Sequence, residues 1–184
     1  MPNKYLKTLF LYNGIFVFAG SLLGPLYALY VEKLGSGIFP VSVSWAVFLF
    51  STTLFTYLIS KLGDRFNHKQ LLLGGYLVRM ICWLVLVYIS NIEQLIVVQF
   101  VLGIGEAFGT PAWDAIFAEH LDNNKHIMDY SDWKVVSNGV LVLGTLLGGF
   151  IVSSYRFKPM FGLMAIFAGV SFVGILSNET LKES

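Results

Sequence analysis

The chain reads SKLGDRFNHKQLL from Ser60 to Leu72, a short charged segment between two long apolar runs, Val41–Lys61 and Gln70–Ser90. Each run has about 20 residues, the length that an α-helix needs to cross the hydrocarbon core of a bilayer. Further runs of this kind occupy Lys7–Val31, Glu93–Ala118, Trp133–Ser153 and Pro159–Ser177. The pattern predicts an all-α membrane protein with six transmembrane helices and short connections.

The composition leaves no room for a separate soluble domain. Of the 184 residues, 56% are hydrophobic and 12% are charged, and the mean hydropathy is +0.72. Soluble domains carry about 25% charged residues, which is about twice as many. Six helices of about 20 residues use up most of the chain. We therefore expect one six-helix transmembrane domain over residues 1–184.

Several function classes find no support in the sequence. The net charge of +1 gives no bulk attraction to nucleic acid, and the single Cys82 excludes a disulfide within the chain. The three histidines show no metal-ligand spacing, no nucleophile stands beside a base, and the glycines of Gly103–Gly109 lie inside an apolar run instead of after a strand. We expect no metal, no cofactor, no nucleotide site and no enzyme activity.

The basic residues predict the orientation. If the N-terminus is cytoplasmic, eight basic residues lie on the cytoplasmic side and three on the other side. The eight are Lys4, Lys7, Lys61, Arg65, Lys69, Lys125, Lys134 and Lys182, and the three are Lys33, Arg156 and Lys158. Because positive residues favour cytoplasmic loops, we expect a multi-pass protein of the cell (plasma or inner) membrane with both termini in the cytoplasm.

The two halves of the chain resemble each other weakly. Gly20-Ser-Leu-Leu-Gly24-Pro25 in the first run parallels Gly105-Glu-Ala-Phe-Gly109-Thr-Pro111 in the fourth run. Two shorter matches keep the same order: Arg65-Phe66 with Arg156-Phe157, and Ser90-Asn91 with Ser177-Asn178. Units of about 1–91 and 92–184 with three helices each would form a 3+3 inverted repeat. The alternative is that these small residues only allow helices to pack closely.

The segment from Ser60 to Leu72 resembles the G-x-L-a-D-R-x-G-R-K-x-x-L signature of the major facilitator superfamily, with Asp64, Arg65 and Lys69 at the expected spacing. In the fourth run, QFVLGIG from Gln99 looks like the family's R-x-x-q-G-x-G element. Gln99 stands where the family has an arginine with a proposed role in proton coupling. Gly144-Thr-Leu-Leu-Gly148-Gly149 is similar to the exporter-associated G-P-x-x-G-G element, with threonine in place of proline.

The resemblance implies half of a normal family member, which has twelve helices in two six-helix halves, each a 3+3 inverted repeat. The substrate cavity lies between the halves, so one half cannot enclose a pathway. This chain would then form a parallel dimer, pair with a different half, or be a fragment or relic. We favour the parallel homodimer, with the second and fifth helices in the interface. Gly144, Gly148 and Gly149 offer a smooth face for it.

The resemblance also implies a gate in the loop between the second and third helices. Asp64 would face the positive N-terminal end of the fifth helix of the opposing half. Arg65 would pair with a carboxylate at the cytoplasmic end of the fourth helix, which is Glu119 here. These contacts would break as the halves rock. The alternative is that Arg65 and Lys69 only orient the neighbouring helices.

Three ionisable side chains are expected at membrane depth, where an unpaired charge is costly. At about 1.5 Å per residue, Arg79 and Glu106 lie near the middle of the bilayer and Asp114 lies nearer the cytoplasmic face. Arg79 could pair with either carboxylate, and such a pair could serve only to fasten two helices. A carboxylate in a cavity that opens to alternate sides can exchange protons, and Glu106 is our leading candidate for this role.

In the family, the first and fourth helices line the cavity. Polar and aromatic side chains of these two helices complete the expected site, and they are Asn13, Tyr27, Gln99 and Trp113. Without an ATP site, transport would be secondary. We expect an alternating-access transporter of small molecules that is coupled to protons, with the exporter-like glycines indicating export. The alternative is a noncatalytic membrane subunit or scaffold with the same half fold, but a scaffold has little reason to keep carboxylates at this depth. The expected partners are the lipid bilayer, a second copy of the chain, a small-molecule substrate and protons.

Overall fold

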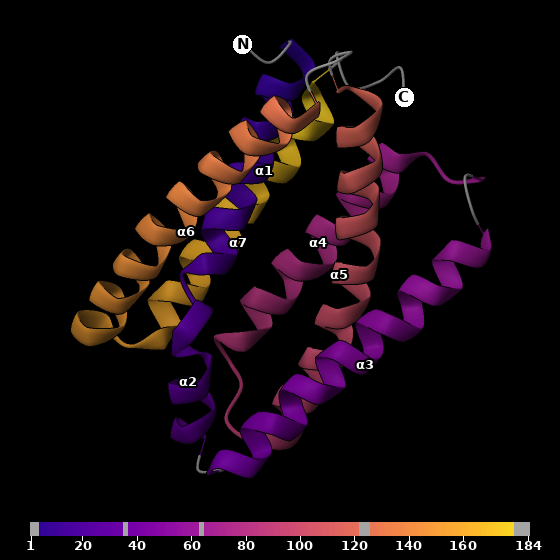
Figure 1. Ribbon diagram of the computed structural model, residues 1–184. Coiled ribbons are helices and arrows are strands. Elements are labelled where there is room, and N and C mark those ends of the chain that lie inside the picture. Colours follow the sequence, from indigo (N-terminus) through magenta and orange to yellow (C-terminus); the bar gives the residue numbers. More distant parts are fainter. Residues whose placement is uncertain (1–3, 35–36, 63–64, 122–125, 179–184) are drawn as a thin grey trace.

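The computed structural model describes residues 4–34, 37–62, 65–121 and 126–178, and the regular structure in these ranges is entirely helical (Figure 1). The helices are α1 (Lys4–Ser21), the short 3-10 helix η1 (Gly24–Leu26), α2 (Tyr27–Lys33), α3 (Ile38–Leu62), α4 (His68–Leu86), α5 (Ile92–Glu119), α6 (His126–Tyr155) and α7 (Phe157–Ser177). Six stretches of the described chain are long and apolar enough to cross a membrane, and α1, η1 and α2 together make the first. The prediction of an all-α protein with six spans is confirmed.

The first span is interrupted where the sequence carries Gly24 and Pro25. α1 ends at Ser21, and α2 begins only after the 3-10 turn. Proline has no backbone N–H and its ring crowds the preceding turn, which explains why one straight helix does not cover the predicted Lys7–Val31. In contrast, α5 continues through Pro111.

Polar residues define the ends of several helices. The Asn67 side chain accepts a hydrogen bond of 3.1 Å from the backbone N–H of Gln70 at the start of α4. Asn91 accepts one of 2.9 Å from the N–H of Gln94 at the start of α5. Such caps satisfy N–H groups that have no partner within the helix. Between α6 and α7 the chain turns at Arg156, whose positive φ of 71° allows a one-residue connection.

Hydropathy placed the start of the fifth span too late. The apolar run begins at Trp133, whereas α6 begins at His126 and includes Asp129 and Asp132. Acidic residues favour the first turns of a helix because they interact well with its positive N-terminal end. The helix therefore extends beyond the segment that is apolar enough to lie in the bilayer.

The helices pair across the two halves of the chain. α3 packs on α5, and α6 packs on α1, while α4 contacts both α5 and α7, and α1 also contacts α7. When the first, second and third spans are exchanged with the fourth, fifth and sixth, the same pairs of spans are in contact. A 3+3 inverted repeat requires this symmetry. α1 begins and α7 ends at the same end of the bundle, which we name the terminal end (Figure 1). The other end is named the opposite end.

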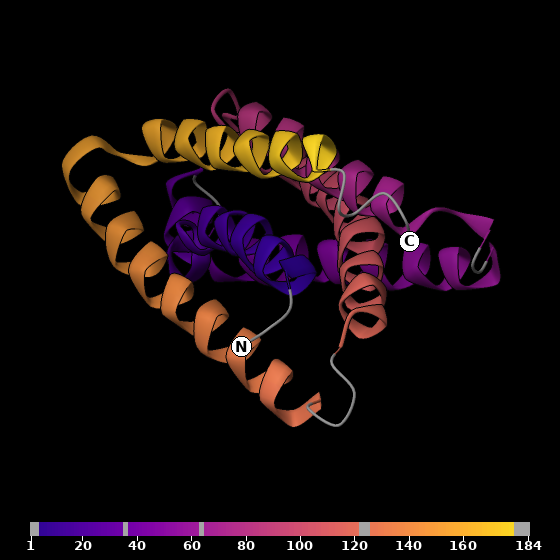
Figure 2. The same ribbon diagram turned by 90° about the horizontal axis from the view of Figure 1, so that it is seen from above.

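The core lies among α1, α4, α5 and α7, and α3 and α6 lie on the two flanks (Figure 2). In the most apolar 18-residue stretch of α3, only 11% is buried inside the chain. In the corresponding stretch of α6, only 22% is buried. Their outer faces carry large apolar side chains such as Phe50, Val142 and Phe150. These faces are suited to lipid or to another apolar protein surface.

Glycines allow close approach at two helix crossings. A Cβ atom on Gly75 of α4 would lie 2.6 Å from the backbone nitrogen of Gly109 in α5. A Cβ atom on Gly144 of α6 would lie 3.0 Å from the carbonyl oxygen of Phe18 in α1, and one on Gly148 would overlap the backbone of Leu22. Side chains at these positions would therefore force the helices apart.

Candidate functional site

An ion pair joins α4 to α5 in the middle of the bundle. The Nη1 atom of Arg79 donates a hydrogen bond to Oε2 of Glu106. The other carboxylate oxygen, Oε1, accepts a hydrogen bond from the hydroxyl of Thr110, one turn further along α5. Of the two carboxylates that the sequence offered to Arg79, the structure therefore pairs it with Glu106.

The surroundings of Arg79 hold its side chain against α5. Its guanidinium lies over the ring of Phe16 in α1, 4.3 Å from the ring centroid, which is within the range of a cation–π interaction. A Cβ atom on Gly105 would lie 2.8 Å from Cγ of Arg79, and one on Gly109 would lie 3.0 Å from its Nη2 atom. The two glycines thus leave the space that the arginine occupies. Its Nε atom is buried without a hydrogen-bond partner among the described residues.

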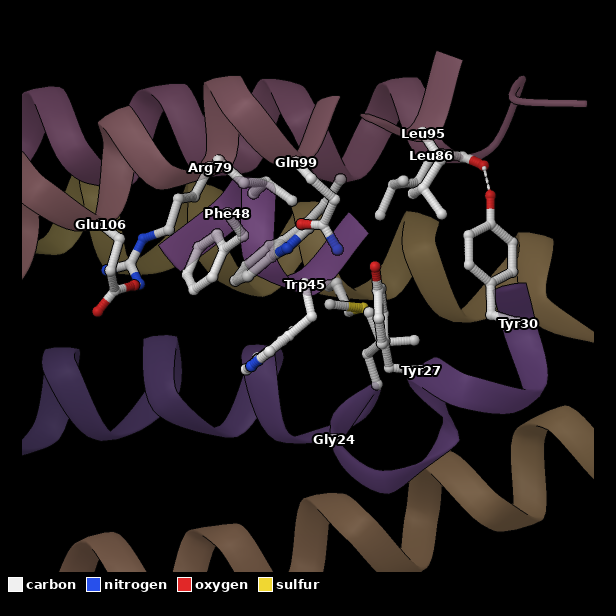
Figure 3. A pocket seen from close by; sticks show the side chains of 15 residues that line it. Gly24, Tyr27, Tyr30, Trp45, Phe48, Arg79, Leu86, Leu95, Gln99 and Glu106 are labelled. Carbon is white, nitrogen blue, oxygen red and sulfur yellow. Dashed lines mark hydrogen bonds and ion pairs between the residues drawn. The ribbon is translucent and has the colours of Figure 1, made fainter. Parts of the chain in front are cut away.

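The ion pair borders two hollows in the bundle. The first, which we name the aromatic hollow, has a volume of about 200 Å³ and extends toward the opposite end, where Tyr30 and Leu86 line it. Figure 3 shows the side chains that line it. The second, the polar hollow, has a volume of about 300 Å³ and extends toward the terminal end. Four residues line both hollows: Gly20, Arg79, Trp83 and Glu106. The pair therefore lies between two spaces that lead in opposite directions.

The aromatic hollow begins where the first span is broken. Its wall includes Gly24, Tyr27, Tyr30, Trp45, Phe48 and Gln99. The hydroxyl of Tyr27 shares a 2.6 Å hydrogen bond with that of Ser44, and the hydroxyl of Tyr30 donates to the carbonyl oxygen of Leu86 at 3.2 Å. In Figure 3, Arg79 and Glu106 lie at one end of this hollow and Tyr30 lies at the other. Several flat aromatic surfaces thus surround a space that ends at a carboxylate.

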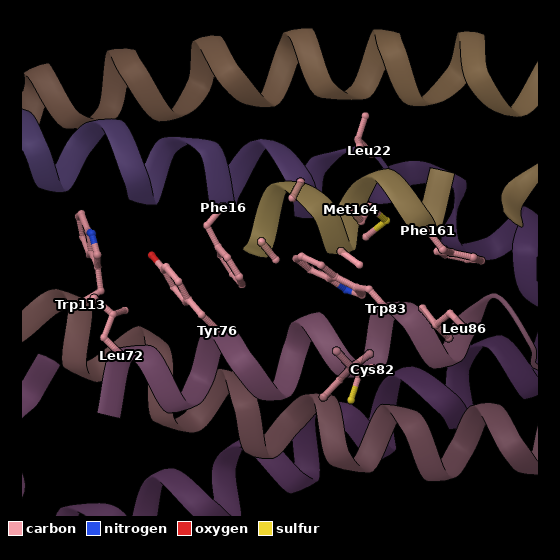
Figure 4. Packing of buried hydrophobic residues seen from close by; sticks show 14 of the residues in the cluster. Phe16, Leu22, Leu72, Tyr76, Cys82, Trp83, Leu86, Trp113, Phe161 and Met164 are labelled. Atoms are coloured by element: carbon pink, nitrogen blue, oxygen red, sulfur yellow. The ribbon is translucent and has the colours of Figure 1, made fainter. Parts of the chain in front are cut away.

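The polar hollow contains more hydrogen-bonding groups. The Tyr76 hydroxyl donates to Oδ1 of Asn13, and its ring stacks on Phe16 with centroids 3.9 Å apart. Trp113 lines the hollow with an indole N–H that has no acceptor among the described residues. Asp114 is exposed within the chain and also lines this space. Figure 4 shows Trp113, Tyr76 and Phe16 following one another along the bundle.

Comparison with known proteins gives the family. The model of the Major Facilitator Superfamily matches residues 9–182. The chain belongs to the Major Facilitator Superfamily. It is therefore a membrane transporter and not an enzyme, and the family resemblance seen in the sequence is confirmed.

Two kinds of relative are similar to this facilitator. It is 28% identical over 166 residues to the uncharacterized MFS-type transporter YitZ of Bacillus subtilis (strain 168), covering 89% of this chain and 98% of that protein. It is 29% identical over 160 residues to the multidrug resistance protein MdtG of Dickeya zeae (strain Ech586) and 31% identical over 165 residues to that of Rahnella sp. (strain Y9602). Both alignments cover 84% of this chain but 39% of the relative, so the facilitator spans about two fifths of these proteins.

The described residues of the signature segment lie at the terminal end, and their contacts in this structure are not those expected. Asp64 lies outside the described residues. Glu119 does not pair with Arg65 but with His68, whose Nδ1 atom lies 3.0 Å from its Oε1 atom. His68 is the first residue of α4 and lies next to the last residue of α5, whereas Arg65 is exposed. Lys69 donates a 2.9 Å hydrogen bond to the carbonyl oxygen of Asn178 and so ties α4 to the end of α7.

The glycines that we expected at a dimer interface face different ways. Gly144 and Gly148 pack on α1 of the same chain, whereas a Cβ atom on Gly149 would have no neighbour within 4 Å. Within the facilitator the first two glycines are therefore needed for the α1–α6 contact. A role of Gly149 in dimer contact stays a prediction.

Sequence reasoning missed Thr110, Phe16 and Gly75. Thr110 follows Glu106 by four residues, and residues with this spacing are neighbours on a helix surface, so this contact could have been found. Phe16 and Gly75 come from other helices, and their positions depend on tertiary packing.

Proposed function

We propose that this facilitator is a secondary transporter that exports small amphipathic molecules in exchange for protons, acting as a parallel homodimer. The observation that carries the proposal is the Arg79–Glu106 ion pair between two hollows that lead to opposite ends of the bundle. A charged pair at membrane depth is expensive, and such residues in membrane proteins usually mark ion or substrate pathways.

The ion pair offers a simple coupling step. A proton on Glu106 removes the negative charge that holds Arg79, so the guanidinium loses its partner and the contact between α4 and α5 weakens. Loss of the proton restores the pair. Binding of a substrate in the aromatic hollow would compete with the same proton, because Glu106 lines that hollow. Proton and substrate would thus occupy the site in turn, as exchange requires.

The lining of the aromatic hollow supports the substrate class. Tyr27, Trp45, Phe48 and Trp83 present aromatic surfaces, and few polar groups accompany them. Flat apolar molecules with one polar or charged group fit such surroundings. The names of the Dickeya and Rahnella relatives, multidrug resistance proteins, agree with export of molecules of this kind.

The bare flanks of the bundle support a dimer. α3 contributes Trp45 and Phe48 to the aromatic hollow, and α6 contributes Trp133 to the polar hollow. The remaining surfaces of these helices are apolar and largely uncovered. A second copy related by a two-fold axis along the membrane normal would cover one side of each hollow and enclose a pathway between the copies.

We propose that the terminal end is cytoplasmic, because of the eight-to-three excess of basic residues. Cysteine labelling tests this orientation with little background, since Cys82 is buried. In intact cells, a membrane-impermeant maleimide should label Tyr88→Cys at the opposite end, where the native side chain is 82% exposed. Arg65→Cys should be labelled only after the cells are opened. The reverse result would show that the terminal end faces outward.

Transport can be measured in proteoliposomes with ethidium as a flat cationic probe. An inward-directed proton gradient should drive ethidium movement in the opposite direction, and dissipating the gradient with a protonophore should stop it. Glu93→Gln serves as the control, because Glu93 is an exposed carboxylate at the start of the same helix and lines neither hollow. It should behave as the wild type. Ethidium movement that ignores the gradient would contradict the proposed coupling.

A further inference from the structure

The two hollows differ in chemistry although they share the ion pair. Aromatic rings dominate the hollow at the opposite end, whereas Asn13, Tyr76, Thr110 and Asp114 bring polar groups to the other. On α5, three of the hollow-lining polar residues, Glu106, Thr110 and Asp114, follow one another at intervals of four and share one face. They extend over about 12 Å along the helix from the ion pair toward the terminal end.

We propose that Thr110 is a proton relay between Glu106 and Asp114, so that protons leave the coupling site through the polar hollow while the organic molecule uses the aromatic hollow. This inference rests on the proposed proton-coupled function and assigns separate routes to its two cargoes.

The hydrogen bonds of the polar hollow single out Thr110. Its hydroxyl already donates to Oε1 of Glu106, and a hydroxyl can accept one proton while it gives away another. The Tyr76 hydroxyl is engaged with Asn13, and the indole of Trp113 can donate but not accept. Within the described residues, Thr110 is thus the hydroxyl in this hollow that contacts the carboxylate.

The proton movement balances without any other reactant. Protonated Glu106 gives its proton to the Thr110 oxygen, while the hydroxyl proton of Thr110 passes through water in the hollow to the Asp114 carboxylate. A volume of about 300 Å³ is ample for such water molecules. The net change is the transfer of one proton from Glu106 to Asp114, and Glu106 is then free to pair with Arg79 again. Asp114 finally releases the proton at the terminal end.

The ionisable groups around Glu106 are consistent with this direction. Arg79 and Tyr76 face it from α4, Asp114 lies on its own helix, and Tyr27 lines the aromatic hollow from α2. α1 contributes the uncharged Phe16 and Asn13, α3 contributes Trp45 and Phe48, and α6 contributes Trp133. Among the described residues that line the polar hollow, Asp114 carries the second carboxylate, so it is the group that can receive the proton from Glu106.

The test compares Thr110→Val, which keeps the shape but lacks the hydroxyl, with Thr110→Ser, which keeps the hydroxyl. In proteoliposomes, Thr110→Val should slow ethidium movement driven by a proton gradient by at least about tenfold. Exchange of ethidium at equal pH on both sides should continue at the wild-type rate. Thr110→Ser should restore gradient-driven movement. Thr53→Val on α3 is the matched control, because Thr53 lines neither hollow, and it should have no effect.

The outcomes separate this inference from the proposed function. If Thr110→Val kept the wild-type rate and pH profile of gradient-driven ethidium movement, the relay would be wrong, but proton coupling would still hold. Thr110→Val that slows equal-pH exchange as much as driven movement would also overturn it, because the residue would then be structural. If the wild-type protein exchanged ethidium but did not respond to a proton gradient, this result would contradict the proposed function and therefore also the relay. An altered pH profile in Asp114→Asn supports the route, and an unchanged profile contradicts it.

Discussion

Replacing Glu106 with glutamine is expected to lower the free energy of unfolding by about 3 to 5 kcal/mol, because it leaves the Arg79 guanidinium without its carboxylate in the middle of the bundle. The amide keeps the size of the side chain and can still accept the Thr110 hydrogen bond, so packing is little changed. Thermal unfolding in mild detergent measures the loss. Glu93→Gln, which removes an exposed carboxylate from the same helix, should change stability very little.

A double variant separates charge pairing from proton exchange. Arg79→Met together with Glu106→Gln removes both charges and replaces the arginine by a flexible apolar chain of similar length. Much of the lost stability should return, since neutral replacement of a buried pair is often tolerated. Transport driven by a proton gradient should remain absent. If Glu106→Gln alone were as stable as the wild type, the pair would not contribute to the fold as we describe.

Replacing Gly148 with leucine should prevent folding or destabilise the bundle by about 3 kcal/mol or more, because the side chain would be forced into the backbone of Leu22, directly after the end of α1. The carbonyl carbon of Leu22 lies only 2.8 Å from the position of the added Cβ atom, and backbone cannot move aside as a flexible side chain can. Yield of folded protein and thermal unfolding in detergent would show the effect.

The neighbouring glycine is the matched control. A Cβ atom on Gly149 would meet nothing within 4 Å, so Gly149→Leu should fold normally. Native mass spectrometry of this variant also tests the dimer, because a larger side chain at a two-fold contact should shift the mass toward monomer. Equal destabilisation by both substitutions would contradict the α1–α6 packing, and an undisturbed dimer in Gly149→Leu would exclude Gly149 from the interface.

The sequence was a good guide wherever hydropathy and local chemistry decide the structure. Length and apolarity alone require membrane-spanning helices, and Asn91, which lies between the third and fourth apolar runs, caps the start of α5. Hydropathy alone predicted one continuous run over the first span, whereas the structure interrupts it at Gly24 and Pro25. The apolar run that predicted α6 begins at Trp133, seven residues after the helix itself begins at His126. The hydropathy of a sequence does not detect the part of a helix that extends into water.

The candidate site was predictable in its residue types but not in its contacts. Counting along the chain placed Arg79 and Glu106 at similar depth, yet spacing could not decide whether Arg79 would pair with Glu106 or Asp114. That choice depends on the crossing of α4 and α5, which Gly75, Gly105 and Gly109 bring unusually close together. In this structure Glu119 pairs with His68 at the start of α4, a contact that the sequence did not indicate, and the pairing of Arg65 with Glu119 stays a prediction.

Proton release on substrate binding tests most directly the claim that Glu106 exchanges a proton with the substrate. In weakly buffered detergent solution, at a pH low enough for Glu106 to carry a proton, addition of ethidium should lower the pH as the wild-type protein binds it, with binding followed by fluorescence in the same sample. Arg79→Met/Glu106→Gln should release no protons at equal ethidium occupancy, while Glu93→Gln should match the wild type. Undiminished proton release from the double variant, or ethidium binding by the wild type without any release, would contradict the account.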